Sequence, residues 1–365
     1  MDPVAAPSNT VAASDKAASP ASYSPATTIV FDAGVRYGMH PRWRNFLGEM
    51  AYFGFDPDVN EVARLNRVNS LSNVTFTPLA LASQPGTKTL RLYKHRGYSS
   101  FFDLDPNYGR ISHYRPGEGV IEKTIEVETI TVDEFAEREH VEVDFMKVDV
   151  EGSELDVMLG ASEQLRRSLK GLRISVWFTE GFKGGALFPE MHQFLLKHDF
   201  FLVNLDYVGR GYPVHPCVGN PDRLQQDHDR YGVLSACEAV YVKNAQSLDR
   251  APQASTETQG LAQLKYAYFC FLNDAPDLAL KCLTAFAHQP SEYSESVKAT
   301  KLYQQLRLTT VRYLGRWRTN PTDQNWKLAQ ATVQELFGLP LESGHKYWEL
   351  VQELEYSARE ASACG

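Results

Sequence analysis

Charged residues alternate with apolar ones along a segment near the middle of the chain, VDFMKVDVEGSELDVMLGA. Lys147, Asp149 and Glu151 stand two residues apart, so they share one face of a predicted strand, and Glu154 follows in the first helical turn. Charge on a strand that is expected to be buried needs a partner or a function. Either Asp149 and Glu151 are general bases that Lys147 orients, or Lys147 only neutralises two structural acids.

A loop with two glycines follows the first apolar segment, in FDAGVRYG. Asp32, Gly34 and Gly38 stand where the chain would leave a strand for a helix. In an open α/β sheet, ligands bind beyond the carboxyl ends of the strands, and glycine lets the backbone approach them closely. The loop lacks the GxGxxG spacing that seats a pyrophosphate on a helix N-terminus. The pattern therefore predicts a nucleoside-type ligand that need not carry a pyrophosphate.

An acidic residue also ends the second apolar segment, FGFDPD, in which Asp56 precedes Pro57. A carboxylate at this place can accept both hydroxyl groups of a ribose, as in nicotinamide and S-adenosylmethionine sites. Together with DxGxxxG and no diphosphate fingerprint, it favours S-adenosylmethionine over NAD. In the structural alternative, Asp32 caps the turn and Asp56 is the N-cap of the next helix, with Pro57 at the first helical position.

A loop rich in glycine, tyrosine and serine, GYSSFFDLDPNYG, lies in an insert that interrupts the alternation of strands and helices. Inserts of this length are usually functional or disordered. Aromatic rings and hydroxyl groups such as those of Tyr98, Ser99 and Ser100 suit stacking on a sugar and hydrogen bonding to it, so the loop is predicted to be a substrate lid. His113 could reach over the site as a base, or could be an exposed loop residue.

The elements that position these residues follow a pattern of short β-forming segments alternating with helical ones, which is typical of βαβ units and a mostly parallel sheet. The connection before the last strand contains no convincing helix, so the last two strands could be antiparallel. Helices are predicted near 41–50, 57–66, 153–166 and 189–198. Seven strands are predicted at 28–33, 51–56, 73–77, 143–150, 172–178, 200–207 and 238–243.

From about residue 256 the hydrophobic period is helical alone, in segments at 260–272, 277–288, 294–317, 325–337 and 343–358. The pattern predicts an all-helical unit at 256–365 after an α/β unit at 28–248. The helical unit could support homo-oligomerisation or docking of another enzyme of the same pathway. Residues 1–27 are rich in Ala, Ser and Pro and are predicted to form a disordered tail.

The composition argues against a nucleic-acid-binding protein and against a membrane-spanning one. The chain has 365 residues, 43% of them hydrophobic, and a formal net charge of −8, which disfavours binding to nucleic acid. No apolar run is long enough to cross a bilayer. The five cysteines are odd in number and contain no CxxC pair, which fits a reducing cytoplasm. Asp227, His228 and Asp229 match no known metal-site spacing, so we predict a soluble protein with no metal at these residues.

The string KVDVEGSELDVMLGA, with IVFDAG, FGFDPD, NVTFTPLALAS and TITVDEF, resembles the FkbM family of S-adenosylmethionine-dependent methyltransferases over roughly residues 28–207. The resemblance implies a Rossmann-like class I methyltransferase fold, with helices on both faces of a seven-stranded sheet whose last strand is antiparallel. It also implies O-methylation of sugars or of polyketide-type natural products. The residues implied to bind S-adenosylmethionine are Asp32, Gly34, Arg36, Gly38, Asp56, Pro57 and Ala80.

The chain departs from the family pattern in the glycine loop, where GVRYG replaces the usual GANxG, and at Asp56, where the family often has Glu. Arg36 could pair with the carboxylate of the methionine moiety or point into solvent. Two other classes stay open. A nicotinamide oxidoreductase would share the fold and Asp56, and a noncatalytic nucleoside-binding module would use the helical region to recruit a partner.

Overall fold

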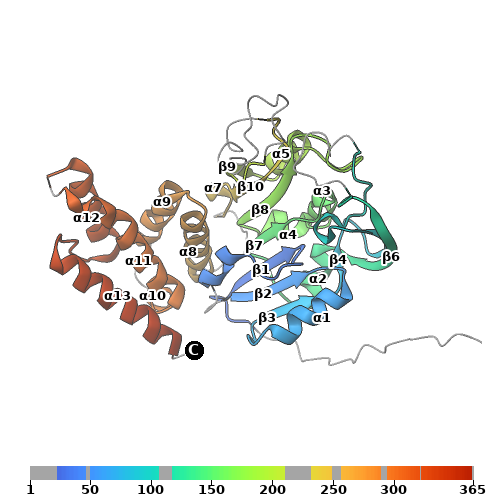
Figure 1. The fold of residues 1–365 in the computed structure, drawn as a ribbon. Coiled ribbons are helices and arrows are strands. Elements are labelled where there is room, and N and C mark those ends of the chain that lie inside the picture. The colour runs from blue at the N-terminus through green and yellow to red at the C-terminus, as the bar shows by residue number, and fades with distance from the viewer. Residues whose placement is uncertain are drawn as a thin grey trace, which may run out of the picture.

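The computed structural model describes residues 23–46, 50–106, 117–209, 232–248, 256–288, 294–320 and 322–363. Within these ranges an α/β part is followed by a set of helices (Figure 1). His113, the Asp227 to Asp229 segment and the first 22 residues lie outside the described residues. No helix in the described ranges combines the length and the apolar character needed to cross a bilayer.

The main sheet has seven strands in the order β3-β2-β1-β7-β8-β10-β9. All neighbours are parallel except β10, which is antiparallel to both β8 and β9. The predicted fold class and the antiparallel strand are therefore confirmed. The strands are β1 (Thr28–Ala33), β2 (Met50–Phe55), β3 (Val74–Thr77), β7 (Phe145–Val148), β8 (Gly171–Trp177), β9 (Phe200–Asp206) and β10 (Ala236–Lys243).

Alternate residues of the strands feed two hydrophobic layers, one on each face of the sheet. On one face, side chains such as Val30 and Phe145 pack against η1 (Pro41–Phe46), α1 (Val59–Val68) and a helix of the C-terminal region. On the other face, side chains such as Phe31 and Met146 pack against helices that come from the α/β part. A sheet covered on both faces explains why its central strands are almost continuously apolar. The helices of the second face are α2 (Val132–Arg138), α3 (Glu154–Leu159), α4 (Ser162–Arg167) and α5 (Phe188–Lys197).

Two helix predictions were wrong in detail. The segment predicted as a helix at 41–50 is the short 3-10 helix η1, and the one predicted at 153–166 divides into α3 and α4 at Gly160. A β carbon on Gly160 would lie 2.1 Å from the carbonyl oxygen of Ala82, so the chain passes too close for any side chain. Asp133 then caps the second helix, because its carboxylate accepts the backbone N–H groups of Glu163 and Gln164.

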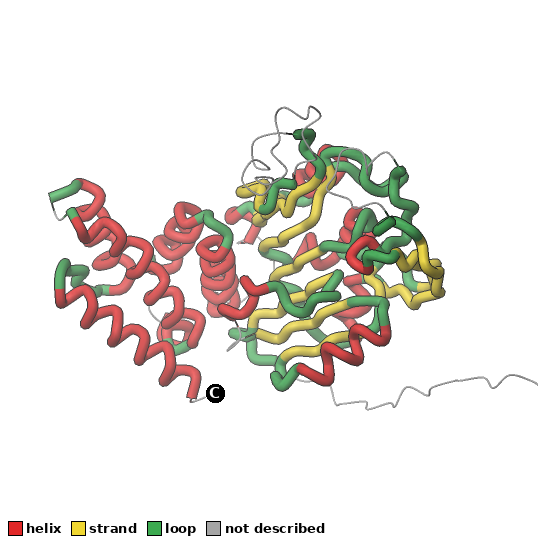
Figure 2. The backbone as a smooth tube through the Cα atoms, in the orientation of Figure 1, coloured by secondary structure: helices red, strands yellow, loops and turns green. Residues whose placement is uncertain are grey.

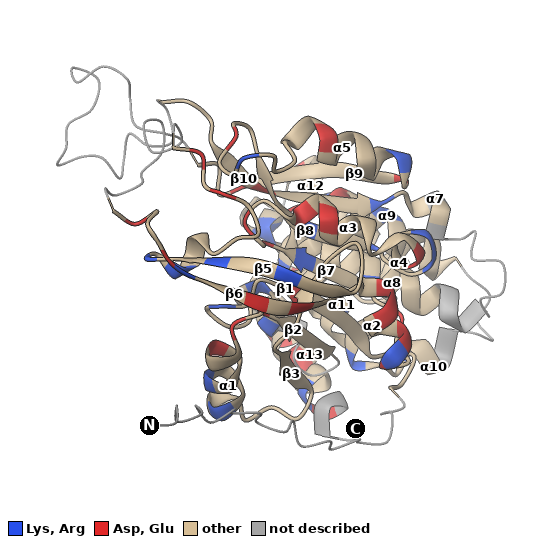
Figure 3. Cartoon of the chain, turned by 90° about the vertical axis from the view of Figure 1, so that its right-hand side faces the viewer, with Lys and Arg blue, Asp and Glu red and all other residues tan. Residues whose placement is uncertain are grey.

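The insert forms a second sheet of three strands in the order β4-β6-β5. Its strands are β4 (Ala80–Leu81), β5 (Gly86–Tyr93) and β6 (Ile121–Ile130), and a short 3-10 helix, η2 (Arg96–Tyr98), follows β5. A small apolar cluster that includes Leu90, Leu92 and Val127 holds the sheet together. The charged residues of β5, Lys88 and Arg91, are basic, whereas β6 carries mainly acidic ones (Figure 3).

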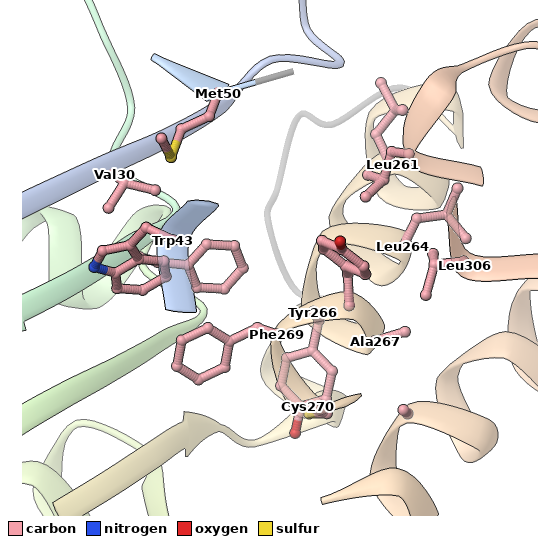
Figure 4. Close-up of a cluster of buried hydrophobic side chains, with 14 of the residues drawn as sticks. Val30, Trp43, Met50, Leu261, Leu264, Tyr266, Ala267, Phe269, Cys270 and Leu306 are labelled. Carbon is pink, nitrogen blue, oxygen red and sulfur yellow. The ribbon is translucent and has the colours of Figure 1, made fainter. Parts of the chain in front are cut away.

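In the helical region, α8 stands between the main sheet and the helices that follow it (Figures 1 and 2). The ring of Phe269 on α8 stacks on Phe145 of β7 with centroids 4.5 Å apart, and Trp43 of η1 stacks on both (Figure 4). Gly171 leaves room for this stack. The helices are α7 (Ala245–Leu248), α8 (Thr256–Leu272), α9 (Pro276–Ala287), α10 (Ser294–Lys298), α11 (Lys301–Leu314), η6 (Gly315–Thr319), α12 (Gln324–Phe337) and α13 (His345–Ala363).

A buried carboxylate anchors α8 to the sheet. Asp144, just before β7, accepts hydrogen bonds from Lys265 Nζ at 2.8 Å, from Lys170 Nζ at 2.5 Å and from the backbone of Ile29 at 2.9 Å. Lys265 also donates to the carbonyl of Thr27. Burial alone would raise the pKa of Asp144, but the two lysines lower it below its ordinary value. The domain boundary at residue 256 stays a prediction, but α8 shares one core with the sheet.

Candidate active site

A cavity of about 240 Å³, open to solvent, lies at the carboxyl ends of β1, β2 and β7. This is the edge at which ligands bind in open α/β sheets. The insert forms the opposite wall. The lining residues are Ala33, Gly34, Arg36, Tyr37, Phe55, Asp56, Pro57, Leu79, Ala80, Leu81, Leu90, His95, Arg96, Gly97, Tyr98, Ser99, Phe101, Asp149, Val150, Glu151 and Ser153.

The glycine loop lies flush against the loop after β7. Gly34 has φ of 88°, and a β carbon there would lie 1.8 Å from the carbonyl oxygen of Asp149. Its backbone N–H donates to the carbonyl of Phe55, while the N–H of Asp149 donates to Ala33. The predicted requirement for glycine therefore has a physical cause at Gly34. Gly38 also has positive φ, 90°, but it does not line the cavity.

Asp56 lies at the end of β2, where the sequence predicted a ribose-binding carboxylate. Its side chain lines the cavity although the residue is only 4% exposed. Its Oδ1 accepts the backbone N–H of Asp58 at 2.8 Å. Burial raises the pKa of Asp56, and the neighbouring Arg36 opposes that shift. The alternative that Asp56 caps the next helix is wrong, because Asp58 is the N-cap of α1 and accepts the N–H groups of Asn60 and Glu61.

Arg36 does not extend into solvent. One guanidinium nitrogen, Nη2, lies 3.1 Å from Asp58 Oδ2 and 3.5 Å from Asp56 Oδ1, and the side chain is 15% exposed. Burial alone would raise the pKa of Asp58, but hydrogen bonding and charge from Arg36, with the helix N–H groups, lower it. The arginine of the glycine loop is thus paired with the two aspartates that follow β2.

Asp32 and Lys147 are neighbours in the register of β1 and β7, beneath the cavity and not on its wall. Tyr52 donates its hydroxyl to Asp32 Oδ2 at 2.8 Å, and Lys147 Nζ lies 3.9 Å from Asp32 Oδ1 and 3.2 Å from Asp149 Oδ2. Burial raises the pKa of Asp32 to about 6, against the effects of Lys147 and Tyr52. Burial alone would lower the pKa of Lys147, but Asp149 and Asp32 raise it, so the amine stays charged.

The acids after β7 differ in their surroundings. Asp149 faces the cavity with its side chain 46% exposed. Glu151 also lines the cavity and has φ of 56°, a strained backbone for a residue other than glycine. Burial, with the charges of Asp149 and Glu154, raises the pKa of Glu151 well above its ordinary value. The carboxylate of Glu154 accepts the N–H groups of Val150 and Gly152, so this residue holds the turn.

The predicted substrate loop contributes Tyr98 and Ser99 to the cavity, but not Ser100. Ser100 is buried, and its hydroxyl donates to the carbonyl of Glu151 at 2.6 Å and accepts the N–H of Phe102. Its placement does not support the predicted contact with substrate, because its hydrogen bonds join the insert to the turn after β7. The loop is also joined to the segment after β8, since Asp105 N–H donates to the Gly181 carbonyl.

Sequence reasoning missed several polar groups of the cavity. Three lining side chains, in the part of the chain that the structure describes, have a buried atom without a hydrogen-bond partner: His95 Nδ1, Ser99 Oγ and Ser153 Oγ. The ring of His95 lies 4.5 Å from that of Tyr98. His95 stands directly before η2, two residues ahead of the predicted loop. Its position, two residues beyond the end of β5, was the signal available in the sequence.

Buried polar atoms without partners are rare in proteins and require an explanation. Here all three belong to residues that line the cavity. Among residues with described positions, His, Cys, Asp and Glu side chains form no group of three that could hold a metal ion.

Residues 32–202 match the family model described as the methyltransferase FkbM domain. Together with the sheet order and the cavity, this match identifies that segment as an FkbM methyltransferase domain, and it confirms the resemblance noted in the sequence. Among solved structures, the methyltransferase FkbM from Methylobacillus flagellatus KT aligns with 14% sequence identity and a TM-score of 0.33, over 60% of this chain and 44% of that chain. The chain thus spans less than half of that structure's length. No curated protein matches the chain.

Proposed function

We propose that the protein is an S-adenosylmethionine-dependent O-methyltransferase that acts on a hydroxyl group of a sugar, a glycan or a natural product. The family match supports methyl transfer. The observation that carries the proposal is the single cavity that joins Asp56, at a ribose-binding position, to Asp149, a carboxylate that could accept a hydroxyl proton.

The lining of the cavity fits this cofactor. Asp56 would hold the ribose hydroxyls, and Gly34 lets the backbone of the loop approach the ligand. Leu79, Ala80 and Leu81 supply an apolar wall of the kind that suits an adenine ring. Pro57 lies beside Asp56 on the same rim. When bound, S-adenosylmethionine supplies a methyl group on a positively charged sulfur, which makes that carbon open to attack by an oxygen.

The residues on the other side of the cavity fit an alcohol acceptor. Asp149 would take the hydroxyl proton, and Lys147, at 3.2 Å, holds that carboxylate in place. Glu151, whose raised pKa favours its protonated form, would donate a hydrogen bond to an acceptor oxygen. Tyr98 and Ser99, with His95 beside them, would bind the rest of the acceptor. The main contribution of such a site is to hold the two reactants in line for displacement.

Two binding experiments and one assay of methyl transfer test the proposal. Calorimetry on the full chain should show binding of S-adenosylhomocysteine and none of NADH. Radiolabelled S-adenosylmethionine should then transfer its methyl group to at least one member of a set of methyl glycosides and hydroxylated polyketides. Binding of NADH alone would favour an oxidoreductase. Binding of S-adenosylhomocysteine with transfer to no hydroxyl in either set would remove the O-methylation part and favour a noncatalytic module.

A further inference from the structure

Arg36 forms an ion pair with Asp56, the carboxylate that the proposed function assigns to the ribose. The arginine comes from the glycine loop after β1, and Asp56 and Asp58 follow β2, so the contact joins the two loops that border the cavity. The three side chains are 15%, 6% and 17% exposed. An ion pair this far from solvent is held more strongly than one on the surface, because water screens it less.

The hydrogen bonds of Asp56 show that this pair competes with a ligand. Its Oδ1 accepts the N–H of Asp58 at 2.8 Å and lies 3.5 Å from Arg36 Nη2. The first contact is a hydrogen bond and the second is an ion pair, so Oδ1 lies between an N–H donor and a cation. A ribose hydroxyl that approaches Oδ1 therefore competes with Arg36 for that oxygen.

Moving Arg36 has an electrostatic cost. Asp58 keeps its hydrogen bond to Arg36 through Oδ2, while its Oδ1 accepts the N–H groups of Asn60 and Glu61, so the move leaves the guanidinium group with one carboxylate instead of two. A guanidinium group that loses one carboxylate in a largely buried place is stabilised again only by another anion. The ligand itself can bring that anion, because a carboxylate is the group that arginine binds best, often through two parallel hydrogen bonds.

We propose that Arg36 is a specificity-determining residue that exchanges Asp56 for the carboxylate of the ligand's amino-acid part. This inference rests on the proposed function. A ligand with both a ribose and a carboxylate replaces the contact that it breaks. A ligand with the same nucleoside but no carboxylate breaks the Arg36–Asp56 ion pair and offers Arg36 no new partner. Arg36 therefore makes tight binding depend on the amino-acid part of the cofactor.

Two ligands that differ only in that part test the exchange. S-adenosylhomocysteine and 5′-methylthioadenosine share the adenine, the ribose and the thioether, but the second lacks the amino-acid carboxylate. Calorimetry on the full chain should show a much lower Kd for S-adenosylhomocysteine. In Arg36→Met, that Kd should rise by at least about tenfold, the effect of losing one charge-assisted hydrogen bond. The Kd of 5′-methylthioadenosine should stay the same or fall, because Asp56 no longer has to be released.

Two further variants control for charge and for folding. Arg44→Met removes an exposed arginine from the neighbouring η1 and should leave both Kd values at the wild-type level. Arg36→Lys keeps a cation without the planar guanidinium and should keep part of the preference. The ratio of the two Kd values is measured within each variant, so a partly unfolded sample changes the fitted stoichiometry and not the ratio.

The possible results separate this inference from the proposed function. A wild-type protein that binds both ligands equally, or an Arg36→Met variant in which both Kd values change by the same factor or neither changes, overturns the exchange. A wild-type protein that does not bind S-adenosylhomocysteine overturns the proposed function as well. Binding of that ligand with an unaltered ratio in Arg36→Met overturns only the role of Arg36.

Discussion

Asp149 and Glu151 line the same cavity but differ in the charge that they are expected to carry. Asp149 is half exposed and ion-paired with Lys147, whereas burial and the charge of Asp149 raise the pKa of Glu151. We therefore expect Asp149→Asn to lower kcat by at least about a hundredfold, the low end of general-base catalysis, with unchanged affinity for S-adenosylhomocysteine. Glu151→Gln resembles the protonated acid and should keep most of the activity at neutral pH. The kcat of each variant is measured with an acceptor identified among the glycosides and polyketides. A larger fall in kcat for Glu151→Gln than for Asp149→Asn would make Glu151 the base.

The raised pKa of Glu151 also predicts how stability depends on pH. The folded protein holds this proton more tightly than the unfolded chain, whose glutamate pKa is near the ordinary 4.5. The free energy of unfolding therefore falls as the pH rises from that value through the higher folded pKa. Glu151→Gln removes this loss, so its Tm should exceed that of the wild type near about pH 8 and match it near about pH 4.

Thermal unfolding at the two pH values checks this prediction, with Glu137→Gln as the control. Glu137 is exposed on α2, so its substitution should change Tm little at either pH. A Glu151→Gln variant that is less stable than the wild type at the higher pH would show that the carboxylate is ionised and held by a favourable partner.

At the scale of single residues, the sequence predicted contacts that depend on strand period and missed those that depend on turns. Lys147 and Asp149 were predicted to share one face, and their side chains meet, although β7 ends at Val148. Glu151 stands beyond the strand, in a left-handed turn, so its direction did not follow from the spacing. Whether Asp56 or Asp58 caps α1 depended on one backbone turn, and both residues satisfy the same sequence preference.

At the scale of elements, β8 and α8 pack so closely that there is no space for a side chain at Gly171. A β carbon on Gly171 would lie 2.4 Å from the ring of Phe269, which stacks on Phe145. We expect Gly171→Ala to lower the free energy of unfolding by about 1 to 3 kcal/mol, the usual effect of overpacking. Chemical denaturation measures it. When Phe269 is also replaced by leucine, Gly171→Ala should lower the free energy of unfolding by less than it does in the wild-type background. If the two changes are additive instead, the strain lies elsewhere.

Elements that depend on the local sequence pattern were predicted, and features that depend on long-range contacts were not. All seven strands of the main sheet were found from short β-forming segments. The signal is strongest in strands such as β1, β2 and β7, which are buried on both faces. The break between α3 and α4 was not found, because it arises where Gly160 meets the carbonyl of Ala82 from a distant part of the chain. The sequence also gave no indication that α8 would cover the sheet, since its helical period does not identify what its apolar face contacts.

At the scale of the whole molecule, the packing of α8 argues that the helices from residue 256 onward are needed for the α/β part to fold. Without them, the sheet face around Val30, Phe145 and Val240 would be exposed to water. Asp144 would lose Lys265 as a partner, and a buried carboxylate without full compensation is strongly destabilising. A chain that ends at residue 255 should therefore be insoluble or show no cooperative unfolding transition, as circular dichroism during heating would reveal.

A second truncation provides the matched control. Removing residues 1–22, which are part of the tail predicted at 1–27, should leave both Tm and the affinity for S-adenosylhomocysteine at their full-length values. The deletion keeps Thr27, whose carbonyl accepts a hydrogen bond from Lys265. The two truncations together distinguish a missing structural layer from a general sensitivity to shortening. If the chain that ends at residue 255 instead unfolds cooperatively and binds S-adenosylhomocysteine as tightly as the full chain, the helices form an independent domain. The stacking of Phe269 on Phe145 would then be a domain interface, and the sheet face beneath it would be stable when exposed to water.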